Sequence, residues 1–437
     1  TIPSCVTEIG TKAFYGNSNL KNMNYLGSLS QWCSMVKKSS PTEFTHKLVI
    51  GGSEITGAVT VPVNSYGYSF TGCTGITSVN LTNVTVVGYH DFEDCSNLSS
   101  VTNSGKVTEV ESYGFYGCSK LSSFDFSMVD SLGSRAFSYS GLTSVYLPVI
   151  FMMNEGAFYY CQKLTSVSIT GKKNMQIWDD AFGMCENLSS LTFNTTNCEI
   201  MGCRVFQSCT KLTELNLPAS KLKYLGPNMF QFCTGLTKVS FGGTYTTTSG
   251  SNTYTFSQGI GAYAFADCEN LTSVTIASGT DNFEKGVFSY CKKLTSITLP
   301  NSVRYISDEM FRSCEKLTTV NFPNNSNFYS IGDNAFSGCT SITSISIPDS
   351  VETIGEEAFC NMDSLTSVTL GSGIKTIKNR AFFNWSGQVC KLTSLTFNGT
   401  KKFKIKSFAS TSDSDPYATN VILNLANYKT YVKGYWY

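Results

Sequence analysis

The sequence is constrained most by a motif of about 23 residues that recurs along the chain. The motif is clearest in residues 302–323, where the apolar positions are Val303, Ile306, Phe311, Leu317, Val320 and Phe322. The same pattern returns around Phe336 and in residues 350–370. One such repeat cannot bury its apolar face alone, so repeats of this length stack on one another. The period therefore predicts a solenoid.

The spacing of apolar residues within the repeat predicts the local structure of each part of the repeat. Leu317, Val320 and Phe322 have the spacing Leu-x-x-Val-x-Phe. Apolar and polar residues alternate at the end of this segment, which predicts a short half-buried strand. Phe311 and Cys314 are three residues apart, the spacing of one helical turn. Residues 303–306 form a second short extended piece. We therefore expect a mainly β, leucine-rich-repeat-like solenoid with short helical or 3-10 turns and a parallel sheet of about 15 rungs.

The phenylalanine that precedes the cysteine, here called the key phenylalanine, defines the domain organisation. It occurs at positions 14, 70, 92, 115, 137, 158, 182, 206, 230, 265, 288, 311, 336, 359 and 382, with Phe408 as a degenerate further copy. We assign residues 1–400 to the solenoid. Two long intervals predict an insert at 24–62, with a strand at 47–50, and a hairpin or loop at 242–261. Residues 401–437, in which the pattern decays, are expected to cap the last coil.

Eleven of the 17 cysteines lie three residues after a key phenylalanine. In a stack of coils their side chains point the same way, which is poor geometry for disulfides or zinc. We expect a column of buried, reduced thiols that act as small apolar side chains. Only the six cysteines outside this column could form bridges, and Cys198 with Cys203 is the nearest pair in sequence.

Residues 350–370 closely match the pattern Ser-Val-x-x-Ile-Gly-x-x-Ala-Phe-x-x-Cys-x-x-Leu-x-x-Val-x-Leu, except that Met362 replaces the cysteine. This pattern resembles the BspA-like leucine-rich repeats of bacterial surface proteins. Residues 27–33, 48–52 and 59–62 are also similar to a segment that recurs in such proteins. The resemblance implies an extracellular or surface-attached binding protein, with host matrix or plasma proteins such as fibronectin and fibrinogen as the class of partner.

Composition excludes several other functions. The formal net charge is +1, which gives no basic excess for nucleic acid or an anionic membrane. The longest apolar run, residues 149–153, is far too short to span a bilayer. Because Thr1 falls within a repeat, we expect a leader segment upstream of it.

A catalytic centre is not expected. The chain has two histidines, His46 and His90, and we expect His90 to be exposed and non-catalytic. No phosphate-binding loop, dinucleotide glycine pattern or zinc-protease motif occurs, so we predict no enzyme activity, no cofactor and no metal. Asp413 and Asp415 lack the rest of a calcium loop.

A candidate recognition surface lies where the outward-facing strand residues stop being serine and threonine. Asp125 and Tyr146 occupy successive repeats of one column, and Glu214 and Lys238 occupy a neighbouring one. Aromatic and charged side chains are typical interface anchors. The plain alternative is an exposed ion pair and an isolated tyrosine.

A second candidate is Phe151 with Met152, which occupy outward positions in their repeat near Tyr159 and Tyr160. The alternative is that this shortened repeat tucks Phe151 into the core. For the whole chain, two function classes remain: a secreted or cell-surface adhesion module that binds a protein, and a structural spacer that displays another domain.

Overall fold

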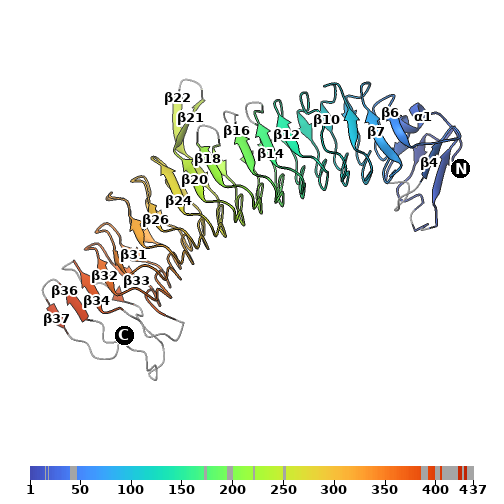
Figure 1. The fold of residues 1–437 in the computed structure, drawn as a ribbon. Coiled ribbons are helices and arrows are strands. Elements are labelled where there is room, and N and C mark those ends of the chain that lie inside the picture. Colours follow the sequence, from blue (N-terminus) through green and yellow to red (C-terminus); the bar gives the residue numbers. More distant parts are fainter. Residues whose placement is uncertain are drawn as a thin grey trace. The chain divides into compact units, whose positions relative to one another are not determined.

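The computed structural model describes residues 1–14, 16–17, 19–39, 47–171, 175–193, 200–219, 222–249, 252–384, 392–398, 404–405, 422–425 and 428–430. The chain falls into two compact units, Thr1–Leu212 and Thr213–Tyr437. Within each unit the chain winds into stacked coils, and a regular coil holds a long strand, a short strand and a turn (Figure 1).

The predicted strands at the end of each repeat form parallel ladders in both units. Ser144 lies opposite Ser166 in unit 1, and Ser344 lies opposite Ser367 in unit 2, so the serine column is in register. The alternating apolar residues point inward, which confirms the period-two reading. The long strands of unit 1 are β6 (Gly57–Thr60), β7 (Ile76–Asn80), β9 (Ser100–Thr102), β12 (Ser144–Leu147), β14 (Ser166–Ile169) and β16 (Ser190–Phe193). Those of unit 2 are β18 (Glu214–Pro218), β20 (Lys238–Gly242), β24 (Ser273–Ala277), β26 (Ser296–Thr298), β28 (Thr319–Asn321), β30 (Ser344–Ser346), β32 (Ser367–Leu370) and β34 (Ser394–Phe397).

The second extended piece forms its own parallel ladder of two-residue strands. Ile306, Ile331 and Ile354 lie opposite one another in successive coils and are buried. Unit 1 contributes β8 (Val86–Val87), β10 (Glu109–Val110), β11 (Ser131–Leu132), β13 (Met152–Met153), β15 (Gln176–Ile177) and β17 (Ile200–Met201). Unit 2 contributes β19 (Tyr224–Leu225), β23 (Gly259–Ile260), β25 (Asn282–Phe283), β27 (Tyr305–Ile306), β29 (Ser330–Ile331), β31 (Thr353–Ile354), β33 (Thr376–Ile377) and β35 (Lys404–Ile405).

The turn around the key phenylalanine differs from the expected helical turn. Its local hydrogen bonds do span three residues, as from Cys95 N to Phe92 O at 3.1 Å. However, the residues two before and two after the phenylalanine have positive φ, as at His90 and Asp94, both 56°. Left-handed residues are costly for side chains with a Cβ and cannot propagate a right-handed helix. Helix in the described residues is therefore confined to α1 (Leu29–Ser34).

These left-handed residues direct alternate N–H groups of the turn towards the neighbouring coil. The N–H groups of His90, Phe92 and Asp94 donate to the carbonyls of Ser112, Gly114 and Tyr116, at 2.8–3.0 Å. The turn is thus hydrogen-bonded both within itself and to the next coil, which satisfies a backbone that strand pairing does not reach.

Key phenylalanines stack along the core of each unit. The ring centroid of Phe92 lies 5.1 Å from those of both Phe70 and Phe115, with nearly parallel planes. This separation follows from the spacing of about 4.8 Å between paired strands. Phe14, in the first coil, is only half-buried, as are Val320 and Phe322 of the repeat analysed above. Most of the predicted core is confirmed, including Val303, Ile306, Phe311 and Leu317.

The cysteine column lies beside this stack and forms hydrogen bonds that the sequence did not predict. The thiol of Cys95 donates to the carbonyl of Phe70 at 3.1 Å, and that of Cys314 to Phe288 at 3.2 Å. The same bond recurs in unit 1 at Cys118, Cys161, Cys185 and Cys209, and in unit 2 at Cys268, Cys291 and Cys339. In the coil of Phe137 the position is taken by Ser140, which is also buried. Cys198 and Cys390 lie outside the described residues.

The predicted insert at 24–62 is built into the stack. Its strand β4 (Lys47–Ile50) pairs in parallel with β2 (Asn22–Tyr25), and β5 (Ser53–Glu54) folds back on β4. Helix α1 begins with a capping box between Ser28 and Gln31. The buried indole of Trp32 donates to the carbonyl of Ser69 at 2.7 Å, which ties this segment to the first regular coil. The remaining strands here are β1 (Glu8–Ile9) and β3 (Val36–Lys37), which pair in parallel.

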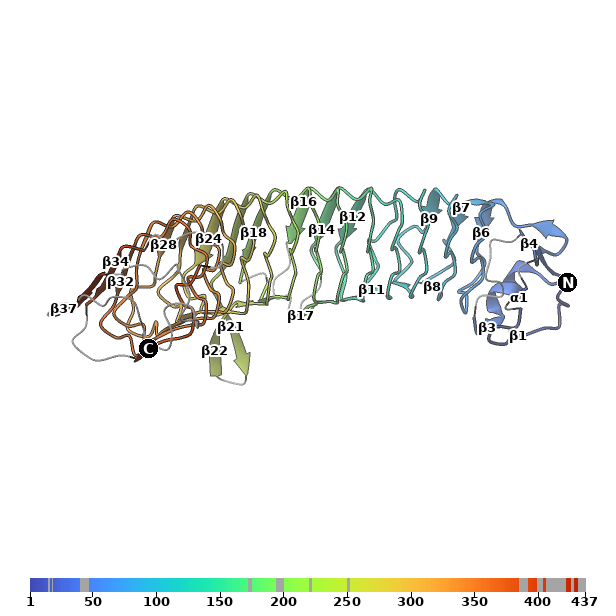
Figure 2. The same ribbon diagram turned by 90° about the horizontal axis from the view of Figure 1, so that it is seen from below.

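Residues 242–261 contain the predicted hairpin. Strands β21 (Thr244–Ser249) and β22 (Asn252–Ser257) pair antiparallel and project from the coils (Figures 1 and 2). At the C-terminal side, β36 (Ile422–Leu425) pairs in parallel with β34, and β37 (Tyr428–Thr430) pairs antiparallel with β36. The boundary of the predicted cap at residue 401 stays a prediction, and Phe408, Asp413 and Asp415 lie outside the described residues.

Replacing Cys314 by alanine should lower the free energy of unfolding by about 1–2 kcal/mol, because the Phe288 carbonyl loses a donor and a small void remains. Cys314→Ser should cost less, since Ser140 shows that a hydroxyl fits this column. Denaturant midpoints at an unchanged m-value would measure both losses. Equal losses for the two variants would contradict a contribution from the thiol bond.

Stability should also fall as the pH rises from about 9 to about 12. Burial raises the pKa of the Cys73 and Cys314 thiols to about 12, from an ordinary value of 9.0. A raised pKa in the folded state stabilises it fully below pH 9, and this contribution is lost as the pH rises through the folded pKa. Each such thiol should contribute a slope of about 1.4 kcal/mol per pH unit. Urea midpoints between pH 8 and 11 that show the same slope for the native protein and Cys314→Ser would refute this.

Candidate functional site

The outward face of the long strands in unit 1 is a polar surface that Tyr146 interrupts. Tyr146 lies in β12, opposite Ser168 in β14, which lies opposite Thr192 in β16. Its side chain is 57% exposed, whereas the flanking Val145 and Leu147 are buried. Asp125, in the preceding coil, is also exposed. The coil before Tyr146 aligns with it through the bond from Thr143 N to Ser122 O, so Asp125 occupies the equivalent position.

The other predicted pair, Glu214 and Lys238, lies in unit 2. The two residues are opposite each other at the start of β18 and β20, and Lys238 Nζ is 3.9 Å from Glu214 Oε2. Both side chains are more than half exposed. Such a pair contributes only about 0.2–1 kcal/mol to stability. It is therefore accessible to a partner without being needed for the fold.

Phe151 lies at the corner immediately before the short strand β13, and Met152 is the first residue of that strand. Phe151 is 41% exposed and Met152 is half-buried, while Ile150 and Met153 on either side are fully buried. Because Ile150 takes the core position, the coil does not draw Phe151 inward. The pair is thus a small exposed apolar site, and its role in binding stays a prediction.

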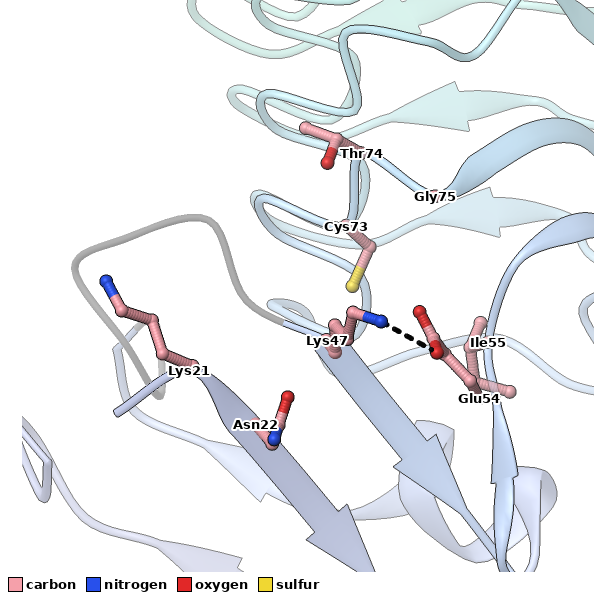
Figure 3. Close-up of a pocket in the computed structure, with 8 residues that line it drawn as sticks. All are labelled: Lys21, Asn22, Lys47, Glu54, Ile55, Cys73, Thr74 and Gly75. Carbon is pink, nitrogen blue, oxygen red and sulfur yellow. Dashed lines mark hydrogen bonds and ion pairs between the residues drawn. The ribbon is translucent and has the colours of Figure 1, made fainter. Parts of the chain in front are cut away.

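A shallow pocket of about 390 Å³ lies among the first strands of unit 1 (Figure 3). Its lining includes Lys21, Lys47, Glu54 and Cys73. Lys47 is paired with Glu54 at 3.3 Å, and the Cys73 thiol is buried with its raised pKa. A thiol held in its protonated form is a poor nucleophile. The Cys73 thiol is therefore not activated as a nucleophile in this pocket.

Two perturbed ionisable groups lie near this end of unit 1, and both have structural roles. The buried Lys37 Nζ donates to the carbonyls of Trp32 and Met35 at 2.8 and 3.0 Å, at the end of α1. Burial lowers the pKa of Lys37 to about 8. Burial raises the pKa of Asp91, whose carboxylate accepts hydrogen bonds from Ser65 Oγ, Ser69 N and Gly88 N. These bonds satisfy helix and turn ends.

His90 is not exposed, contrary to the expectation from the sequence. Only 13% of its side chain is accessible, and its ring stacks between Tyr68 and Tyr113 at 4.8 and 4.4 Å. Its Nδ1 lies 2.6 Å from Glu93 Oε2. His90 is covered because equivalent residues of successive coils stack. The residue two positions before a key phenylalanine lies directly against the residue at the same position in the next coil. His46 lies outside the described residues, and in the described part of the chain no His, Cys, Asp or Glu cluster could hold a metal ion.

Sequence reasoning missed an aromatic surface that contains His90. We call it the tyrosine ladder: Tyr68, Tyr89, His90, Tyr113, Tyr116, Tyr139, Tyr159 and Tyr160. Successive rings are in contact throughout, with centroid separations of 4.0–6.4 Å. Every member lies within three residues of a key phenylalanine, in five consecutive repeats from Phe70 to Phe158. That clustering was the available signal.

In the residues that the structure describes, no helix is both long and apolar enough to cross a membrane. No curated protein sequence matches the chain significantly.

Among solved structures, the chain is similar to a leucine-rich repeat protein from Bacteroides ovatus ATCC 8483. The two share 22% identity at a TM-score of 0.56, over 80% of this chain and 91% of that one, which supports the fold. A leucine rich cell surface protein from Faecalibacterium prausnitzii A2-165 is 21% identical over 62% of this chain and 84% of its own, with a TM-score of 0.33. The leucine rich repeat protein of T. pallidum is 29% identical over 36% of this chain and 77% of its own, with a TM-score of 0.32. The last two superpositions are too poor to support a structural argument.

The sequence profile of the BspA type leucine rich repeat region matches residues 1–39, 66–152, 151–258, 253–340 and 329–419. These matches span most of the chain and coincide with the coils described above. The chain therefore belongs to the BspA-type leucine-rich repeat family.

Proposed function

We propose that this protein is a non-enzymatic, secreted or cell-surface binding protein that attaches to another protein through the outer surface of its coils. The partner class is host matrix or plasma protein, with fibronectin and fibrinogen as the first candidates from the family resemblance. The observation that carries the proposal is Tyr146, 57% exposed on a strand face that otherwise presents small polar side chains. An exposed aromatic side chain on a rigid sheet is a typical binding anchor, because little conformational entropy is lost on contact.

Support also comes from the way the coils are built. The apolar side chains and the thiols fill the core, whereas the outward-facing residues of the long strands do not pack in it. Positions on that face can therefore vary without cost to the fold, as substitutions away from the core usually change stability by less than about 0.5 kcal/mol. A surface that is free to vary on a stiff scaffold suits recognition of a protein.

Within this proposal, Tyr146 and Asp125 form the recognition surface of unit 1, and Phe151 with Met152 adds an apolar contact. Glu214 and Lys238 form the corresponding surface of unit 2. The charged pair would tune association rate and salt dependence, since exposed charges act mainly on encounter.

Tyr146→Ala should weaken binding to the authentic partner about tenfold or more, while Lys238→Glu should mainly lower the association rate. Surface plasmon resonance over immobilised fibronectin, fibrinogen and other matrix proteins would identify the partner and measure both effects. Thr192→Ala, two coils from Tyr146 in the same column, is the matched control.

Unchanged binding in both folded variants would rule out the strand face. Failure to bind any protein in the panel, together with full folding, would instead favour the spacer alternative, in which the coils only display another domain.

A further inference from the structure

The tyrosine ladder of unit 1 is an exposed aromatic surface separate from the strand face. Tyr89, Tyr139 and Tyr160 are 40%, 37% and 38% exposed. The remaining rings are half-buried and contact the exposed ones, as Tyr116 contacts Tyr139 at 5.4 Å. The exposed rings are thus held in place before any partner arrives.

The backbone under the ladder would accept smaller residues. Tyr139 and Tyr160, two residues after their key phenylalanines, have φ of 59° and 58°, where a side chain is strained. The equivalent positions in two other coils of unit 1 are Gly72 and Gly117, also at positive φ. Glycine can therefore adopt the backbone conformation of this position, and the turn does not require tyrosine there.

The charges around the ladder are mostly negative. Asp94 and Glu155 are exposed, and Glu93 and Glu111 are half-buried. Arg135 is the arginine of these turns, and it lies over the Tyr159 ring at 6.0 Å and 4.0 Å from Glu155. The two nearest lysines in sequence, Lys120 and Lys163, bind Asn97 Oδ1 and Ser119 O in the segments that follow the turns.

Arg135 shows the chemistry that this surface favours. A guanidinium group over a tyrosine face at about 6 Å, with a carboxylate beside it, combines a cation–π contact with an ion pair. Asp94, exposed and close to the Tyr116 ring, offers a second carboxylate beside the ladder, and no arginine or lysine is paired with it in the described residues. In the described part of unit 2 the equivalent positions are mixed: Phe232, Tyr263 and Tyr290 are aromatic, but Asn228, Glu309, Asn334 and Glu357 interrupt the columns.

We propose that the tyrosine ladder binds a cationic segment of a partner protein, with arginine side chains stacked on the exposed rings and paired with Asp94 and with Glu155, which Arg135 approaches only to 4.0 Å. Arginine fits better than lysine because its planar group can stack and donate two parallel hydrogen bonds. A neutral glycan could also stack on the rings, but it would gain nothing from the carboxylates. This surface is distinct from the one that contains Tyr146, so the inference does not depend on the proposed strand-face site.

The test is fluorescence polarisation with a labelled peptide of alternating arginine and serine, against matched lysine–serine and glutamate–serine peptides and a neutral oligosaccharide. The arginine peptide should bind most tightly, the lysine peptide several-fold more weakly, and the glutamate peptide not at all. Raising the salt concentration should weaken binding.

The decisive variant is Tyr139→Gly combined with Tyr160→Gly, which removes two rings at positions where the backbone prefers glycine, so the coil should fold. It should weaken arginine-peptide binding about tenfold. Tyr139→Phe with Tyr160→Phe keeps the rings and should bind like the native protein. Asp94→Asn with Glu155→Gln should reduce both affinity and salt dependence. Tyr146→Ala, on the strand face, should have no effect here.

Three outcomes would overturn the inference: no binding of the arginine peptide, unchanged binding in the folded double-glycine variant, or tighter binding of the oligosaccharide through the same tyrosines. The last would make the ladder a glycan site. None of them bears on whether Tyr146 binds a matrix protein, which the Thr192-controlled experiment decides separately.

Discussion

The backbone of most key phenylalanines connects one coil to the next through both its N–H and its carbonyl group. The N–H of Phe92 donates to Gly114 O, and the carbonyl of Phe92 accepts the thiol of Cys118 at 3.1 Å, both in the following coil. The ring stacks on Phe115 in that same coil. The backbone bond, the thiol bond and the ring stacking therefore set the same distance between successive coils. The ladders of long and short strands on either side have this distance as well. A coil that lacked these bonds would leave buried polar groups unpaired.

This constraint explains what the sequence could and could not predict. Strands follow from side-chain alternation, so the ladders of Ser144 and Ser344 were predictable. The left-handed residues at His90 and Asp94 were not, because no glycine marks them and the cost of their backbone is offset by bonds to another coil. The thiol bonds were missed for a similar reason, since their acceptors lie in the preceding repeat.

For the candidate binding surfaces too, the sequence predicted what depends on strand alternation and missed what depends on contacts between coils. Exposure of Tyr146 and pairing of Glu214 with Lys238 follow directly from strand register. The tyrosine ladder depends on which turn positions stack, and that depends on the left-handed backbone. His90 was expected at the surface because other repeats carry polar residues such as Asn334 and Glu357 at this position, yet here both neighbouring coils present a ring. Because equivalent positions of successive coils stack at a fixed spacing, similar residues in successive repeats form a continuous column on the surface. A repetitive core can therefore carry distinct surfaces.

Hydrogen–deuterium exchange of individual turn amides tests the central claim most directly. If the turns are bonded from coil to coil, the amides of Phe92, Phe288 and Phe336 should be protected as strongly as those of the long strands, although they lie in turns. The result that would contradict the account is rapid exchange at these phenylalanine amides while the amides of β14 and β32 remain protected.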